Sequence, residues 1–102
     1  MDNVANLTND AEWIISRRRG SAFAGTPLDV MLRELDVNHI VLAGIATSGV
    51  ILSTVRNAAD MDYKITILKD CCIDLDDEVH RVLMEKVFPS QADVVDSSTY
   101  NW

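Results

Sequence analysis

Two adjacent cysteines, Cys71 and Cys72, carry the side chains best suited to nucleophilic chemistry in this chain of 102 residues. A catalytic cysteine reacts as a thiolate, and a nearby cation or a helix N-terminus usually lowers its pKa. Acidic residues crowd this stretch instead, from Asp70 to Asp77. Because negative charge disfavours the thiolate, we expect both cysteines to be packed in the interior rather than to catalyse.

The two histidines are the next candidates for chemistry. His39 precedes an apolar run, and His80 stands between acidic and basic residues in a helical pattern. Neither has a second ligand at the spacing of a metal site, such as a histidine four residues away on one helix face. We therefore expect both on the surface, and we predict no metal site, no cofactor and no catalytic triad or dyad.

The segment Gly44–Gly49 joins an apolar run to a helical pattern. Free N–H groups at a helix N-terminus can hold an anion or an oxyanion. The segment lacks the three spaced glycines of a dinucleotide fingerprint and the lysine of a P-loop. It is therefore either a ligand loop or an ordinary tight turn.

Alternating apolar runs and helical patterns predict the order β-α-β-α-β-α-β. Strands are expected at 13–15, 39–43, 63–68 and 92–95, and helices after 27, 47 and 74. Such alternation indicates parallel βαβ units, with ligand loops at the carboxyl ends of the strands. We predict an α/β fold, a truncated Rossmann-like three-layer domain with a mostly parallel sheet of about four strands. Its expected parts are a flexible lead-in (1–11), the domain (12–96) and a polar tail (97–102).

The formal net charge of −7 argues against nucleic-acid and membrane partners. Binding to phosphates requires a basic surface, and Arg17–Arg19 is the only basic run. The amino-terminal residues do not resemble a signal peptide, and no apolar run is long enough to span a bilayer. Two cysteines without a disulfide framework suggest a reducing compartment, so we expect a cytoplasmic protein.

Several motifs together resemble the isochorismatase-like (cysteine) hydrolases. Gly44–Thr54 follows the family motif Gly-x-x-Thr-x-x-Cys-Val-x-x-Thr, except that Val50 stands where the family has cysteine. Ser21–Leu28, Lys69–Cys72 and Glu78–His80 match three further family segments in the right order. The resemblance covers about residues 13–95 and implies the C-terminal half of the family domain.

The resemblance also implies that the family's catalytic residues are missing. Many members hydrolyse amides with an Asp, a Lys and a Cys nucleophile. The Cys position falls on Val50, the Lys position falls on Arg17, and the strand that bears the Asp has no counterpart. Arginine keeps the charge but does not readily donate a proton. We therefore expect a catalytically silent family member.

The alternative is an active hydrolase of a small amide or enol ether, with missing residues supplied by another chain. Its ligand would be small and anionic or an amide. The substrate-binding residues would be Arg17, Phe23, Ile45, Ala46, Thr47, Ser48 and Gly49. Some members have a non-proline cis peptide in this loop, and the matching bond is Ile45–Ala46. A third hypothesis is that the chain is a fragment without a separate function.

The resemblance finally implies an open sheet edge. Two strands of the family sheet normally lie between 13–15 and Ile40-Val41-Leu42. Without them, the apolar strand that contains Val41 would be an exposed edge, which favours pairing with another chain. We expect this edge to be covered by a second copy in a symmetric dimer, or by residues 13–15.

Overall fold

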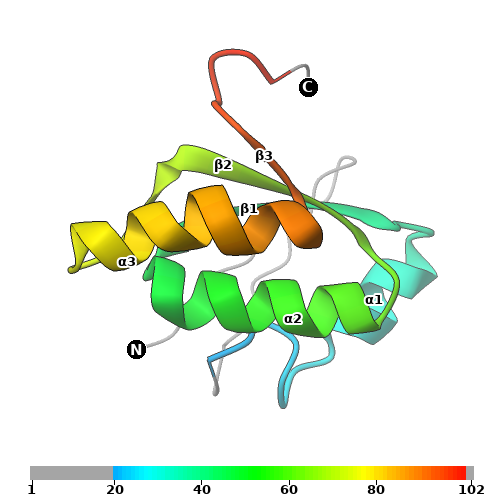
Figure 1. Ribbon diagram of the computed structural model, residues 1–102. Helices are drawn as coiled ribbons and strands as arrows, with labels where there is room; N and C mark the ends of the chain where they lie inside the picture. Colours follow the sequence, from blue (N-terminus) through cyan, green and yellow to red (C-terminus); the bar gives the residue numbers. More distant parts are fainter. Residues whose placement is uncertain (1–19, 101–102) are drawn as a thin grey trace.

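The computed structural model describes residues 20–100, which form a parallel three-stranded sheet with helices packed against it (Figure 1). The strands are β1 (His39–Ile45), β2 (Lys64–Ile73) and β3 (Asp93–Val95), in the spatial order β1-β2-β3. The helices are α1 (Leu28–Glu34), α2 (Leu52–Asp60) and α3 (Asp77–Val82). A π-helical turn (Thr47–Ile51) leads into α2, and a second one (Leu83–Val87) and a 3-10 turn (Phe88–Ser90) continue α3.

This architecture confirms the α/β class and the parallel sheet. The predicted strand at 13–15 lies outside the described residues. Within them, no helix has the length and apolar character needed to cross a membrane.

The core lies between the sheet and the helices. Figure 1 shows α2 and α3 side by side on one face of the sheet. Alternate residues of β2 face them, so Ile65 and Ile67 are buried against Val55 of α2. Phe88, at the end of the α3 segment, is 1% exposed. Packing in this core holds the helices against the sheet and so sets where the ends of the strands and the starts of the helices lie.

Strand β2 is longer than predicted. The expected strand ended at Leu68 and was followed by a loop, but the observed strand continues to Ile73. The extension pairs with the end of β1, with Cys72 opposite Gly44 and Ile73 opposite Ile45, after an irregularity in register. Strand β1 likewise runs past Gly44, where the prediction ended it. Backbone pairing between distant segments outweighed the local turn signals.

Helix α3 begins at Asp77, and Asp76 is its N-cap. The Asp76 carboxylate accepts hydrogen bonds from the N–H groups of Glu78 (3.0 Å) and Val79 (3.1 Å). The side chain of Val79, in the first turn of α3, is exposed. Buried contacts begin one turn later, at Leu83 and Met84.

Candidate functional site

The carboxyl ends of β1 and β2 and the starts of the α2 and α3 segments meet at one end of the molecule (Figure 1). This is the end at which parallel α/β sheets bind ligands. The β1 connection contains Gly44, whose φ of +142° is a conformation that L side chains rarely adopt. The peptide bond between Ile45 and Ala46 is cis. The predicted loop therefore stands where a ligand site would be expected.

Protein groups already occupy several hydrogen-bond donors of this loop. The Ser48 N–H donates to Oδ2 of Asp74 at 2.7 Å. The N–H groups of Gly49 and Ile51 both donate to the carbonyl of Ala46, at 3.0 and 3.3 Å. An internal carboxylate thus lies where the sequence suggested an external anion.

Asp74 is held firmly in its charged form. The pKa of Asp74 is lowered to about 2 by hydrogen bonds from Ser48. The Ser48 side chain has the larger effect on this pKa, and the Ser48 N–H has the next largest. The Asp76 N–H also donates to this carboxylate, at 3.1 Å. The sequence alone indicates only that Asp74 favours the start of a helix. Its contact with Ser48 joins residues 26 positions apart, and no local pattern predicts such a contact.

Thr47 connects this loop to α3. Its side chain is completely buried, and its Oγ1 lies 2.8 Å from Nδ1 of His80. His39 forms a similar pair, with Nε2 2.8 Å from Oγ1 of Thr66. Both histidines are half-buried and hydrogen-bonded, so the prediction that they are simple surface residues is wrong.

The two cysteines have different environments. Cys72 is 5% exposed and belongs to the core, as predicted, whereas Cys71 is exposed. Burial raises the pKa of the Cys72 thiol to about 11, despite a hydrogen bond from the Gly44 backbone that acts in the opposite direction. Cys72 is therefore a protonated packing residue at neutral pH.

The predicted substrate-binding residues differ in their accessibility. Ile45 is 64% exposed, and Val50, which is predicted to occupy the family's cysteine position, is half-buried in the turn before α2. Phe23 is in the core, and its ring stacks on that of Tyr63 with centroids 5.4 Å apart. Arg17 lies outside the described residues. The structure thus gives Phe23 and Thr47 packing contacts, and their role in ligand binding stays a prediction.

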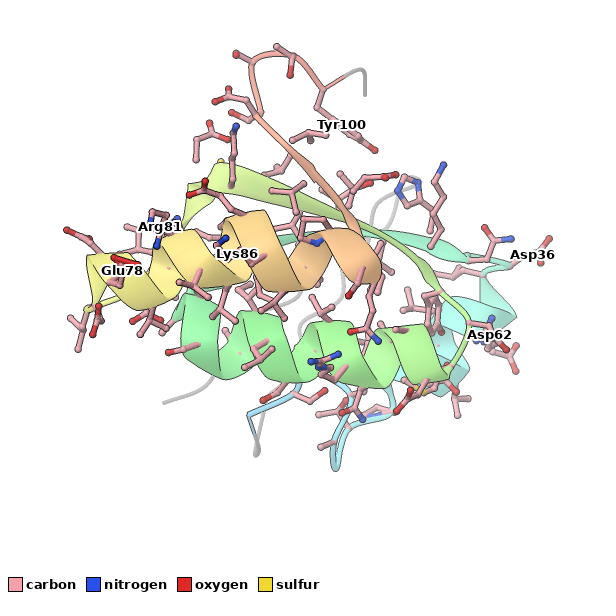
Figure 2. All side chains as sticks on the ribbon, in the orientation of Figure 1. Asp36, Asp62, Glu78, Arg81, Lys86 and Tyr100 are labelled. Atoms are coloured by element: carbon pink, nitrogen blue, oxygen red, sulfur yellow. The ribbon has the colours of Figure 1, made fainter. Side chains whose placement is uncertain are left out.

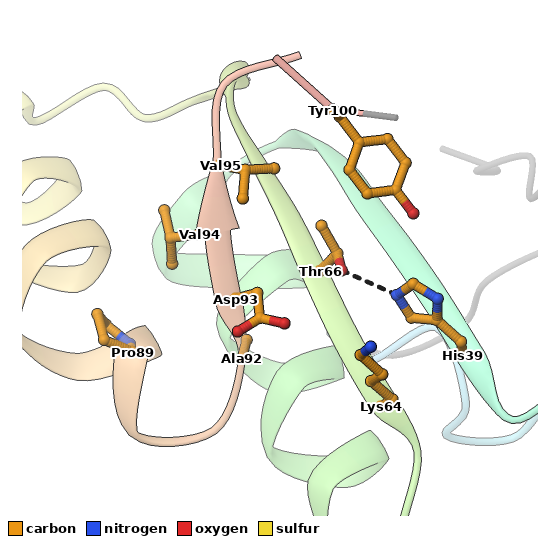
Figure 3. Close-up of a pocket in the computed structure, with 9 residues that line it drawn as sticks. All are labelled: His39, Lys64, Thr66, Pro89, Ala92, Asp93, Val94, Val95 and Tyr100. Carbon is orange, nitrogen blue, oxygen red and sulfur yellow. Dashed lines mark hydrogen bonds between the residues drawn. The ribbon is translucent and has the colours of Figure 1, made fainter. Parts of the chain in front are cut away.

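A cavity of about 460 Å³ lies at the other end of the sheet (Figure 3). It is lined in part by His39, Lys64 and Asp93, which begin β1, β2 and β3. Ligand loops of α/β sheets follow the carboxyl ends of the strands, whereas this cavity lies at their amino ends. The cavity is therefore not part of the candidate site. Within residues 20–100, no group of three or more His, Cys, Asp and Glu side chains could hold a metal ion.

Comparison with known proteins decides the family. The Isochorismatase domain profile matches residues 2–99. The chain belongs to the isochorismatase domain family. The uncharacterized isochorismatase family protein YaaI of Bacillus subtilis is 40% identical over 81 residues, which cover 76% of this chain and 45% of YaaI.

Solved structures of the isochorismatase family have the same fold. An isochorismatase family protein from Burkholderia thailandensis has a TM-score of 0.83 at 27% identity, covering 89% of this chain and 48% of its own. The nicotinamidase PncA from Bacillus subtilis has a TM-score of 0.76 at 29% identity, covering 81% of this chain and 46% of its own. The chain therefore spans less than half the length of these isochorismatase-family relatives.

Proposed function

We propose that this isochorismatase-family chain is catalytically silent by itself and acts through assembly with another chain. The proposal rests on Val50, which the motif resemblance places at the family's cysteine position and which has no nucleophilic atom. Val50 lies in the turn before α2. This turn belongs to the motif segment Gly44–Thr54 and also forms part of the candidate site. Removal of a covalent nucleophile generally eliminates most of an enzyme's rate enhancement.

Neither cysteine of the chain replaces the missing nucleophile. The Cys72 thiol is buried and has a raised pKa, so the thiolate is scarce at neutral pH. Cys71 is exposed, on the strand that leads to the acidic loop before α3. The hydrogen bond between Ser48 and Asp74 further supports a silent site, because it uses a donor that an anionic ligand would need.

The edge of β1 is the proposed assembly surface. Among the described residues, β1 pairs with β2 only, and its Ile40, Val41 and Leu42 are half-buried. Ile40 and Leu42 pack against the core, while Val41 is opposite Thr66 in the register. A second copy paired along this edge would satisfy the outward backbone groups of the strand. A homodimer formed in this way is the proposed assembly.

Ammonia release from nicotinamide tests whether the chain is silent, with Bacillus subtilis PncA as the positive control. We expect no release above the buffer blank from the wild-type chain. The Val50→Cys variant is also expected to be inactive, because the family's Asp and Lys are missing too, and Val50→Ala is its structural control. Ammonia release in proportion to wild-type protein would overturn the proposal.

A second candidate function is hydrolysis at a site completed by another chain. The exposed Ile45 favours it, because this side chain lies in the loop that resembles the family motif and is open to a ligand. Arg17 and the loop Gly44–Gly49 would then hold a small anionic or amide substrate. A hydrolysis rate per chain that rises with protein concentration would favour this alternative.

A further inference from the structure

The end of the molecule that carries the candidate site also exposes several aliphatic side chains. Ile45 is 64% exposed, Ile73 57%, Leu75 101% and Val79 37%. Large exposed aliphatic residues are common singly, but a contiguous group of them marks an interaction surface. These four residues form what we call the carboxyl-end patch.

The backbone brings the members of the patch together. Ile45 and Ile73 are partners in the parallel register of β1 and β2, and neighbouring strands lie about 4.8 Å apart. Leu75 follows Ile73 by two residues, and two residues of chain span at most about 7 Å. Val79 lies in the first turn of α3, three residues beyond the N-cap residue Asp76.

Leu75 is held in its exposed position by the residues on both sides. The Asp74 carboxylate accepts hydrogen bonds from the N–H groups of Ser48 and Asp76. The Asp76 carboxylate accepts from Glu78 and Val79. Both carboxylates are therefore fixed to backbone groups, and the short loop between β2 and α3 presents Leu75 outward. A loop backbone that is already ordered loses less conformational entropy on binding.

The rim of the patch is acidic. The segment from Lys69 to Glu78 contains five acidic residues and one lysine. Asp76, Asp77 and Glu78 are all exposed, and Glu78 lies at the start of α3 (Figure 2). Arg81, further along α3, is already paired with Glu78 and Glu85. Among the described residues, the segment that carries Ile73, Leu75 and Val79 therefore has a negative net charge.

This combination selects one kind of occupant. A second copy docked face to face would place two acidic rims against each other, and like charges across an interface are costly. An anionic lipid surface is disfavoured for the same reason. A protein segment with apolar side chains flanked by lysine or arginine matches both the centre and the rim of the patch.

We propose that the carboxyl-end patch docks an apolar, basic segment of a partner protein. Leu75 and Ile73 bury themselves against the partner's apolar side chains, and the acidic residues around them bind its cations. The patch includes Ile45 at the end of β1, but the proposal does not depend on pairing along the β1 edge or on whether the chain hydrolyses any substrate.

The test measures binding of a fluorescein-labelled amphipathic helical peptide of leucine and lysine by fluorescence anisotropy. Wild-type protein is expected to bind it, with an affinity that falls as salt is raised. The Ile73→Ser/Leu75→Ser double variant is expected to bind at least tenfold more weakly, and Leu75→Ser alone at least threefold. Val30→Ser is the matched control, since Val30 is 64% exposed on α1, and it should bind as the wild type does.

Folding of each variant is checked by its urea midpoint, which should be unchanged because the replaced side chains are largely exposed. Unchanged affinity in the double variant would overturn the proposal. Equal binding of a peptide with glutamate in place of lysine would also overturn it, as would equal binding of one with serine in place of leucine. Two further results would contradict it by assigning the patch to a different occupant. These are equally tight binding to phosphatidylcholine vesicles, and self-association that the double variant abolishes.

Discussion

Tyr63 makes three contacts that connect the start of β2 to α1 and to the segment before it. Its hydroxyl donates to Oδ1 of Asp29 at 2.6 Å, and its ring stacks on Phe23. The Arg33 guanidinium lies 4.2 Å from the centre of the ring and also pairs with Asp29 at 3.3 Å. At the level of single residues, this cluster attaches the short helix α1 to the sheet.

The ionisation of Tyr63 gives a prediction with a defined pH window. Burial, and then the hydrogen bond to Asp29, raise the pKa of Tyr63 from 10.0 to about 12. Since the folded state favours the neutral phenol, its contribution to stability is complete below the unfolded pKa of about 10. That contribution is lost as the pH rises through about 12.

Tyr63→Phe should therefore lower the free energy of unfolding at pH 7 by about 1.5 kcal/mol, through loss of a hydrogen bond to a carboxylate. The difference between wild type and variant should shrink between about pH 10 and 12, as the wild-type phenol ionises. Urea unfolding of both proteins at pH 7, 10 and 11.5 measures this. A difference that stays constant over the range would contradict it.

The residue-level site could be predicted only in part. The position of the loop Gly44–Gly49 follows from local pattern, because a buried strand followed by a helix start is a short-range signal. The bonds Ser48–Asp74 and Thr47–His80 join residues 26 and 33 positions apart. Contacts of this range depend on how the elements pack, and no local pattern in the sequence specifies them.

The element that follows the candidate site, α3, depends on its N-cap. Few buried contacts support its first turn, since no residue of α3 itself is buried and the buried side chains of the segment start at Leu83. Asp76 bonds two N–H groups that the helix itself cannot satisfy. The cap therefore decides whether the turn that bears Val79 is ordered.

Replacement of Asp76 by alanine should destabilise the protein by about 1 kcal/mol, within the range of about 0.5–2 kcal/mol typical of N-cap losses. Asp76→Asn should keep most of the stability, because its amide oxygen can accept the same bonds. Urea midpoints report both effects. Asp77→Ala is the matched control, an exposed acidic residue one position along. An equal loss in Asp77→Ala would show that charge, rather than capping, is responsible.

Helices and strands were easier to predict than their ends. The runs His39–Ala43 and Tyr63–Leu68 marked two strands correctly, because apolar and β-branched residues are typical of buried strands. The extension of β2 from Lys69 to Ile73 begins with charged residues, and no local pattern indicates that it should pair. It is a strand because the end of β1 offers it backbone partners.

At the scale of the whole molecule, β1 lies at one edge of the sheet that the described residues 20–100 form, in the order β1-β2-β3. Its continuous apolar run is typical of a parallel strand that is buried on both faces of a sheet. Solved structures of more than twice the aligned length share the fold. An apolar strand at a sheet edge favours pairing with another chain, and a domain with a small core gains stability from such pairing.

Light scattering coupled to size-exclusion chromatography tests the proposed dimer. The wild-type chain should elute as a discrete species of twice its mass of 11.3 kDa. Val41→Lys places a charge on the half-buried middle of β1, where it should block strand pairing and give a monomer. Val30→Lys adds the same charge at an exposed position on α1 and should remain dimeric.

Two results would contradict a dimer formed through β1. A wild-type monomer at micromolar concentration would show that β1 is covered within one chain or needs no cover. A Val41→Lys protein that stays dimeric would place the interface on another surface. Because Val41 faces away from the helix-covered core, opposite Thr66 in the register, the substitution changes the edge without opening a core cavity. A monomeric Val41→Lys protein with a near wild-type urea midpoint would therefore assign the contact to β1.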